Sequence, residues 1–205
     1  MIKGAEWLFF DVGSTLVDEH FAYEDRMRKI AEAANTTYDS VYETALQFYR
    51  QNQKGDLETA RLLGVGLPSW NKEAEILYGD TVRCLEYLSG KYQIGVIANQ
   101  SLGTERRLER YGILKYIDLV VASAEEGAAK PDKRIFEIAL GKSGCKASRS
   151  VMIGDRIDND IVPAKSLGMF TVWVRQGFGQ YWRIKNETEK ADCTVNSLGE
   201  LCGIL

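Results

Sequence analysis

Short apolar runs that alternate with helix-like segments constrain the fold of this chain most strongly. Runs rich in aliphatic and β-branched residues, each short enough to be a buried strand, lie at residues 7–10, 94–98, 119–122, 151–153 and 170–174. Segments with helical spacing lie between the later runs, at residues 104–111, 132–142 and 158–167. This alternation implies parallel strands joined by right-handed crossovers. The sequence therefore predicts an α/β fold built on a doubly wound, mostly parallel sheet.

Residues 18–77 interrupt the alternation. Apolar side chains recur there at helical intervals, as at Phe21, Met27 and Ile30, without a convincing strand. Turn-forming residues divide this segment into several expected helices: Asn35, Gly55, Gly64, Gly66 and Pro68. We expect an inserted all-helical cap at 18–77 on an α/β core formed by 1–17 and 78–205. A last strand and helix are expected at 192–195 and 197–201.

Composition narrows the class of protein. A chain of 205 residues can bury a sizeable core, and 26 basic against 29 acidic residues give a net charge of −3, which argues against a nucleic-acid partner. The four cysteines lie far apart and there is one histidine, so neither a zinc site nor a disulfide framework is expected. The N-terminus lacks a secretory signal, and no apolar stretch reaches the roughly 18 residues of a membrane helix. These features predict a cytoplasmic protein with no membrane partner; they predict no oligomeric state.

Polar residues follow the ends of the predicted strands. Asp11 follows the first, Asn99 the second and Asp155 the fourth, while Lys130 precedes a predicted helix. Each alone is explained better as a helix cap, a turn residue or a solvated charge than as a site residue. The carboxyl ends of parallel strands, however, meet at one edge of the sheet.

Carboxylates gathered at that edge require a compensating cation. A like-charged pair at about 4 Å costs on the order of 4 kcal/mol at an effective dielectric constant near 20. Oxygen ligands without histidine or cysteine suit a hard ion, and Mg²⁺ shared with a substrate phosphate is the usual case. We therefore expect Mg²⁺ and a small phosphorylated substrate.

Four segments carry a family resemblance: FFDVGSTL (9–16), IGVIANQ (94–100), EEGAAKPDKRIF (125–136) and VMIGDRIDND (151–160). In order and spacing they resemble the four motifs of the haloacid dehalogenase-like (HAD) hydrolase superfamily. The resemblance covers residues 7 to about 179. The position of the insertion, just after the first motif, is similar to the helical C1 cap of that family.

The resemblance implies a two-step phosphoryl transfer, in which Asp11 attacks phosphorus to give an aspartyl-phosphate that water then hydrolyses. It also implies Mg²⁺ held by Asp11, the main-chain carbonyl of Gly13 and Asp155, with Asp160 as a nearby or water-mediated support. Lys130 would bind the phosphate and hold the charge of Asp11. The main-chain amide of Asn99 would help to cradle the transferred oxygens.

Two residues depart from the family pattern. The phosphatases of the family carry an aspartate two residues after the nucleophile, and this chain has Gly13 there. The missing general acid and base is typically worth about 10² to 10⁴ in rate. Ala98 stands where a serine or threonine usually precedes the asparagine, which removes a hydroxyl donor to the phosphate.

Several hypotheses answer these departures. The substrate could have a good leaving group, or Asp18, Glu19 or His20 of the insertion could transfer the proton, although His20 is better interpreted as a surface residue. The leading interpretation is a Mg²⁺-dependent phosphatase of a small metabolite, weakened by Gly13 and Ala98. The alternatives are a catalytically impaired protein that binds a phosphorylated ligand or a protein partner, and a dehalogenase that cleaves a carbon–halogen bond. A receiver domain fits less well, because its phosphate-accepting aspartate belongs on a middle strand.

Overall fold

A six-stranded sheet forms the centre of the computed structural model, which describes residues 4–205. Its strands are β1 (Trp7–Phe10), β4 (Gln93–Ala98), β5 (Leu119–Ala122), β6 (Ser150–Gly154), β7 (Phe170–Val174) and β8 (Cys193–Val195). They lie in the order β5-β4-β1-β6-β7-β8, and each neighbouring pair is parallel. The predicted doubly wound α/β fold is confirmed.

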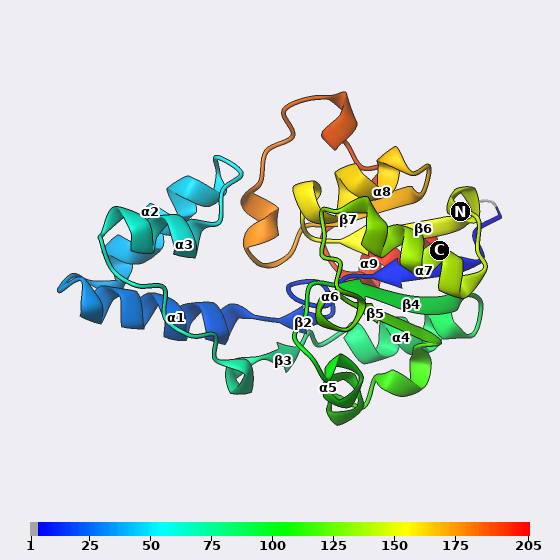
Figure 1. Cartoon of the computed structure of the whole chain (residues 1–205), viewed down its shortest axis with the longest axis horizontal. Coiled ribbons are helices and arrows are strands. Elements are labelled where there is room, and N and C mark those ends of the chain that lie inside the picture. Colours follow the sequence, from blue (N-terminus) through cyan, green and yellow to red (C-terminus); the bar gives the residue numbers. More distant parts are fainter. Residues whose placement is uncertain (1–3) are drawn as a thin grey trace.

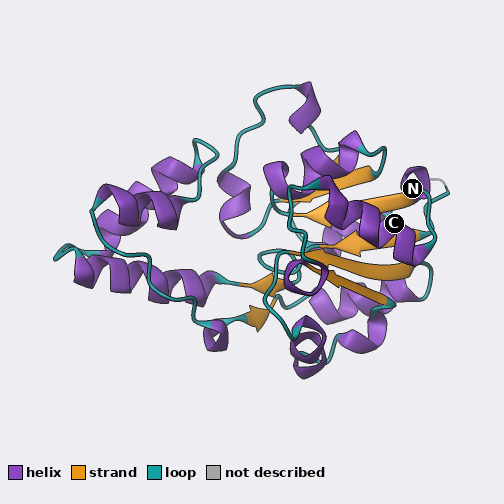
Figure 2. Cartoon of the chain, in the orientation of Figure 1, coloured by secondary structure: helices purple, strands orange, loops and turns teal. Residues whose placement is uncertain are grey.

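The central strand β1 shows why these short runs form buried strands. Its side chains alternate between the two faces of the sheet, so Leu8 and Phe10 enter one apolar core while Trp7 and Phe9 enter the other. Helices α4 (Thr81–Ser89), α5 (Thr104–Arg110) and α9 (Leu198–Ile204) contribute to the first core. Helices α7 (Lys133–Ser143) and α8 (Val162–Ser166) contribute to the second (Figure 2). Burial on both faces explains the continuous apolar runs in the sequence.

Some predicted elements differ from the structure at their ends. The helix expected at 158–167 is a π-helical turn η4 (Ile157–Ile161) that leads into α8. Helix α7 begins after Asp132, whose side chain accepts the amide hydrogen of Arg134 at 2.9 Å. The remaining short elements are α6 (Ser123–Glu126), η2 (Leu114–Tyr116), η3 (Ala147–Arg149), η5 (Gly177–Tyr181) and η6 (Glu187–Glu189). Each helix of residues 4–205 is too short or too polar to cross a membrane.

The chain forms a helical insertion after β1 and before α4, and this insertion lies beside the sheet (Figure 1). It contains α1 (His20–Ala33), α2 (Tyr38–Tyr49), α3 (Gly55–Leu62) and the 3₁₀ turn η1 (Lys72–Ala74). Met27, Ile30, Val41 and Ala45 are buried in a small apolar core of its own. The chain enters and leaves through two short antiparallel strands, β2 (Val17–Asp18) and β3 (Ile76–Leu77). Both predicted boundaries fall within this pair, and the division into core and cap stays a prediction.

The loop between β7 and β8 contacts the insertion directly. Phe178 of this loop stacks on Tyr49 of α2 with ring centroids 4.3 Å apart and planes 8° apart. Asn52 and Arg183 exchange two hydrogen bonds of 2.8 Å, one in each direction. The insertion is therefore attached to the rest of the chain both at the β2–β3 pair and at this loop.

Candidate active site

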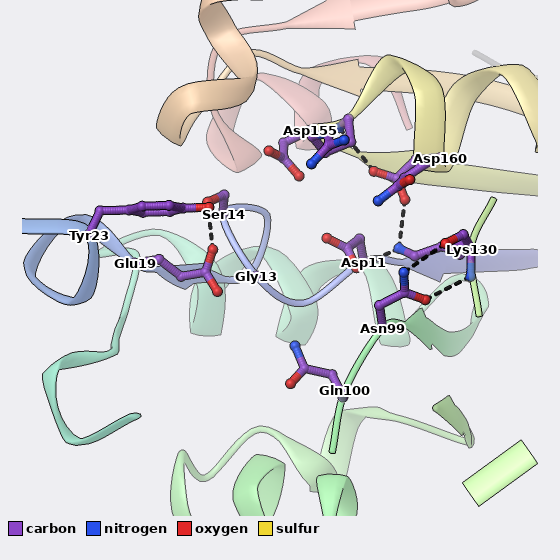
Figure 3. A pocket seen from close by; sticks show the side chains of 12 residues that line it. Asp11, Gly13, Ser14, Glu19, Tyr23, Asn99, Gln100, Lys130, Asp155 and Asp160 are labelled. Atoms are coloured by element: carbon purple, nitrogen blue, oxygen red, sulfur yellow. Dashed lines mark hydrogen bonds and ion pairs between the residues drawn. The ribbon is translucent and has the colours of Figure 1, made fainter. Parts of the chain in front are cut away.

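A buried lysine connects two of the predicted site carboxylates. Lys130 Nζ lies 2.6 Å from Asp11 Oδ1 and 2.6 Å from Asp160 Oδ1, and its side chain is 2 % exposed (Figure 3). Burial alone would lower the pKa of Lys130, but the two carboxylates beside it raise that pKa above its usual value. The ammonium group is therefore charged, and it holds Asp11 at the end of β1.

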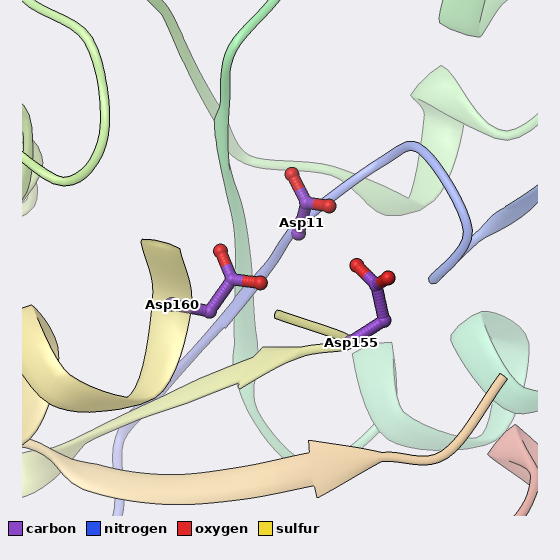
Figure 4. Close-up of side chains that lie close together, drawn as sticks. All are labelled: Asp11, Asp155 and Asp160. Atoms are coloured by element: carbon purple, nitrogen blue, oxygen red, sulfur yellow. The ribbon is translucent and has the colours of Figure 1, made fainter. Parts of the chain in front are cut away.

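Asp155 completes a group of three acidic side chains. Ligand oxygens of Asp11, Asp155 and Asp160 all lie within 4.8 Å of one another (Figure 4). Asp155 follows β6, and its main-chain carbonyl accepts a hydrogen bond of 2.8 Å from the indole of Trp173. Burial, together with the negative charges of Asp11 and Asp160, raises the pKa of Asp155 well above its usual range. Lys130 contacts Asp11 and Asp160 but not Asp155, so ionisation of all three carboxylates would leave the group with an excess of negative charge.

Asp160 is the most deeply buried of the three aspartates. One of its oxygens contacts Lys130, and the other accepts the main-chain amide hydrogen of Arg156 at 2.9 Å. Burial raises the pKa of Asp160 to about 6, against the opposing effect of Lys130. Because both oxygens already have partners, Asp160 is better placed to support a ligand indirectly than to bind it.

Two glycines make room for these carboxylates. A Cβ atom on Gly154 would lie 2.3 Å from Asp160 Oδ2, and one on Gly179 would lie 2.5 Å from Asp155 Oδ2. Both distances are far below a normal contact, so the two positions require glycine. The Gly154–Asp155 pair was visible in the sequence, whereas Gly179 carried no signal because it lies in the distant loop after β7.

Asn99 holds the main chain of Lys130. Its side-chain oxygen accepts the Lys130 amide hydrogen at 2.7 Å, and its side-chain nitrogen donates to the Lys130 carbonyl at 2.8 Å. Sequence reasoning assigned Asn99 a role through its main-chain amide and missed this side-chain pairing. Asn99 joins the ends of β4 and of the loop before α7, and it thereby fixes the position of the lysine.

The carboxylates line a polar cavity of about 160 Å³. Its other described walls come from Gly13, Ser14, Glu19, Tyr23, Asn99, Gln100, Lys130, Arg156 and Asn159. Arg156 and Asn159, which follow Asp155 in the chain, both lie at the cavity. Arg156 also binds Asp158 at 2.6 Å and lies over the ring of Trp182. Ala98 is fully buried at the end of β4, and Ala98 is absent from the described walls.

Of the three insertion residues considered for proton transfer, Glu19 is the one at the cavity. Its carboxylate accepts a hydrogen bond of 2.8 Å from Ser14 Oγ, and burial raises the pKa of Glu19 to about 8. Asp18 instead accepts the main-chain amide hydrogen of His20 at 2.9 Å, which is a local helix-start contact. His20 is exposed, with its ring against Phe21, as expected for a surface residue.

Comparisons with known proteins agree with this geometry. The family model of a haloacid dehalogenase-like hydrolase matches residues 6–168, which include every site residue predicted from the sequence. The chain belongs to the HAD-like hydrolase family. The predicted recognition is therefore confirmed, and the helical insertion after the first motif fits a HAD protein with a cap.

Curated HAD relatives and a solved HAD structure are similar over much of this chain. A glyceraldehyde 3-phosphate phosphatase of Methanothermobacter thermautotrophicus is 31% identical over 94% of this chain and 84% of its own length. One of the same name from Methanocaldococcus jannaschii is 37% identical over 62% of this chain, and the match spans 56% of that protein. The crystal structure of a HAD phosphatase from Thermococcus onnurineus has a TM-score of 0.66 at 24% identity, with 97% of each chain covered, and supports the fold.

Proposed function

We propose that this protein is a Mg²⁺-dependent phosphatase that transfers the phosphoryl group of a small metabolite to Asp11 and then to water. The observation that carries the proposal is the convergence of Asp11, Lys130 and Asp155 on one cavity from three separate segments. The named phosphatases among the similar proteins support the same reaction class.

The donor set fits Mg²⁺. Asp11, Asp155 and Asp160 offer only oxygen ligands, and their negative charge exceeds the single charge of Lys130. Asp11, Asp155 and the carbonyl of Gly13 would hold the ion directly, with Asp160 as its indirect support. When bound, Mg²⁺ supplies positive charge that stabilises the phosphoryl oxygens during transfer.

The protein groups around Asp11 fit a nucleophile. One oxygen of Asp11 is bonded to Lys130, so the carboxylate is held in one orientation while its second oxygen is left to attack phosphorus. The ammonium group of Lys130 also neutralises charge that develops on the transferred oxygens. Asn99 contributes by fixing the main chain of that lysine.

A small phosphorylated metabolite fits the cavity best. The cavity has a volume of about 160 Å³, which accommodates a phosphate and a few further atoms. The glyceraldehyde 3-phosphate phosphatases among the relatives are named for a substrate of that size. In this proposal the helical insertion acts as a cap, because Tyr23 of α1 lines the cavity opposite the sheet (Figure 3).

The direct test measures phosphate release from a panel of small phosphoesters, with Mg²⁺ and with EDTA. Asp11→Asn is expected to reduce the rate to background, while Asp39→Asn, at an exposed position of α2, serves as the matched control and is expected to retain full activity. Hydrolysis that is indifferent to Asp11→Asn would refute the proposal.

The alternative functions lose their main support at the same site. The impaired-protein hypothesis was based on Gly13 and Ala98. In the structure the carboxyl group of Glu19 lies beside Gly13, while the buried Ala98 offers no hydroxyl group to a phosphate. The dehalogenase hypothesis dispenses with a metal, although three carboxylates gather at the site and Lys130 contacts two of them.

A further inference from the structure

The carboxyl group of Glu19 occupies the space where the side chain of residue 13 would begin. A Cβ atom placed on Gly13 would lie 2.5 Å from Glu19 Oε1, 2.9 Å from its Cδ and 3.0 Å from Oε2. A carboxyl group therefore stands beside the nucleophile loop after all, although it comes from six positions further along the chain. No pattern within the first motif reports it.

The surroundings of Glu19 hold one of its oxygens and leave the other beside the loop. Ser14 Oγ donates to Glu19 Oε2 at 2.8 Å, and Ser14 is itself 4 % exposed. Gly177 packs against Ser14, since a Cβ on that glycine would lie 2.7 Å from Ser14 Oγ. The serine is thus fixed from behind, and Glu19 Oε1 lies on the side of Gly13 and the cavity (Figure 3).

Glu19 is not explained as a structural ion pair. Among the ion pairs of residues 4–205, none involves Glu19, and the buried Arg107 nearby is paired with Glu75 instead. A partly buried carboxyl group with one serine as its hydrogen-bond partner costs stability. A purpose other than stability would account for its position. Its position on the cavity wall shows where that purpose lies.

We propose that Glu19 is the general acid and base of this enzyme and replaces the aspartate that Gly13 lacks. The inference rests on the proposed phosphatase function. In the first step, an Asp11 oxygen bonds to phosphorus, the bond to the leaving oxygen breaks, and protonated Glu19 gives its proton to that oxygen. In the second step, Glu19 takes a proton from water as the water oxygen bonds to phosphorus and the bond to Asp11 breaks. Phosphate leaves and Glu19 is protonated again.

The decisive variant is Glu19→Gln, which keeps the size of the side chain and its bond to Ser14 but cannot transfer the proton. With p-nitrophenyl phosphate, whose phenolate leaves without a proton, the first step persists while water attack slows. We expect a burst of about one nitrophenolate per enzyme, then steady turnover slowed by about 10² to 10⁴. Phosphorylated Asp11 accumulates and is detected by mass spectrometry. With the alkyl ester glycerol 3-phosphate, the first step also fails, so there is no burst.

A matched control and a rescue variant complete the test. Glu32→Gln, on the exposed side of α1, is expected to behave as wild type. The double variant Gly13→Asp/Glu19→Ala supplies a carboxyl group from the family's position and is expected to regain at least tenfold over Glu19→Ala. Gly13→Asp alone is a poor test, since its Cβ would collide with Glu19.

The outcomes separate the two proposals. Wild-type turnover by Glu19→Gln, or equal slowing with both substrates and no burst in a folded variant, would overturn the role of Glu19 and leave Asp11 in place. Absence of phosphorylated Asp11 together with an active Asp11→Asn would overturn the phosphatase proposal, and this inference with it.

Discussion

The position of Asp155 depends on a glycine that is 24 residues further along the chain. Gly179 leaves space for the carboxylate, and its own main chain lies against that of Asp155. A side chain at residue 179 must push either the loop or the carboxylate away. The position of Asp155, a proposed Mg²⁺ ligand, therefore depends on a glycine at residue 179.

Gly179→Ala tests this dependence. We expect it to weaken Mg²⁺ binding, measured by calorimetry, by about 10-fold or more, the effect typical when the support of a metal ligand is lost. Gly141→Ala is the matched control, because nothing lies near its Cβ and alanine in the interior of α7 is expected to add about 0.5 to 1 kcal/mol of stability. Unchanged Mg²⁺ affinity in Gly179→Ala would contradict the assignment of Asp155.

Lys130→Met tests the buried ion pairs. Removing the lysine leaves Asp11 and Asp160 charged and buried without their partner, so the free energy of unfolding should fall by about 3 to 5 kcal/mol at pH 8 in metal-free urea titrations. The loss should be smaller at pH 5, because that pH is below the pKa of about 6 for Asp160. Lys133→Met, at an exposed position three residues away, should change stability little. Equal effects of the two variants would contradict this account.

At the residue scale, the sequence predicts site residues that directly follow a strand or precede a helix with a pattern of its own. Asp11, Lys130 and Asp155 could be predicted because each follows a strand or precedes a helix that has its own pattern. The sequence could offer Glu19 only as one of three candidates, together with Asp18 and His20. The turn that directs its side chain toward Gly13 leaves no periodic signal in the sequence. Gly179 and the side-chain role of Asn99 depend on contacts between segments far apart in the chain, and sequence spacing does not report such contacts.

At the scale of elements, aromatic contacts join the insertion to the loop after β7. Phe178 stacks on Tyr49 and meets Tyr23 edge-on at 4.8 Å, and it belongs to the apolar cluster of the insertion although it follows β7 in the chain. The sequence predicted the last strand and helix, but it assigned no element between the strand at 170–174 and the one at 192–195. Phe178 and Tyr181 of this loop pack against the insertion, which leaves no periodic strand or helix pattern in the sequence.

Phe178→Ala should loosen the insertion without unfolding the sheet. The side chain is partly buried, so we expect a loss below the 3 to 5 kcal/mol of a fully buried phenylalanine, about 1 to 3 kcal/mol. Hydrogen exchange should rise in α1 and α2 and stay unchanged in β1 and β4. Phe21→Ala, which removes a half-exposed ring of the same helix as Tyr23, is the control. Faster exchange spread evenly over the chain would contradict a local effect.

The predicted elements differ in how much sequence signal they carry. Strands β1, β4, β6 and β7 were predicted from short apolar runs, and each has four or more successive buried residues. Strands β2 and β3 were missed, because two residues each cannot show an alternating pattern. They are joined by pairing between residues 58 or 60 positions apart, Asp18 with Ile76 and Val17 with Leu77, and that pairing is a property of the folded chain.

At the scale of the whole molecule, the buried carboxyl groups of the site are expected to lower the free energy of unfolding as the pH rises. Burial raises the pKa of Glu19 from 4.5 to about 8 and that of Asp160 from 3.8 to about 6. Within these windows the folded protein binds more protons than the unfolded chain, so stability is present at low pH and is lost as pH rises. In EDTA, the free energy of unfolding should therefore fall between pH 5 and 8, and Glu19→Gln should remove part of that fall.

Magnesium should reverse this loss. At a concentration of 100 times its Kd, a ligand that binds only the folded state adds about 2.7 kcal/mol, which corresponds to a Tm increase of roughly 5 to 10 °C for a domain of this size. The increase should be larger at pH 8 than at pH 5.5, because protons compete for the carboxylates. It should be nearly absent in Asp155→Asn. A Tm increase that is equal at both pH values and in this variant would contradict the site.

The connection between insertion and core gives Glu19 a second property. It lies between β2 and α1, on one of the two short segments through which the insertion joins the rest of the chain, whereas Asp11 stays with the sheet. A swing of the insertion about that pair, if it broke the hydrogen bond between Ser14 and Glu19, would move the proposed proton donor away from Asp11. Closure would then bring the Glu19 carboxyl group back beside the proposed nucleophile. Under this proposal, the enclosure of the substrate and the positioning of the proton donor occur in the same step.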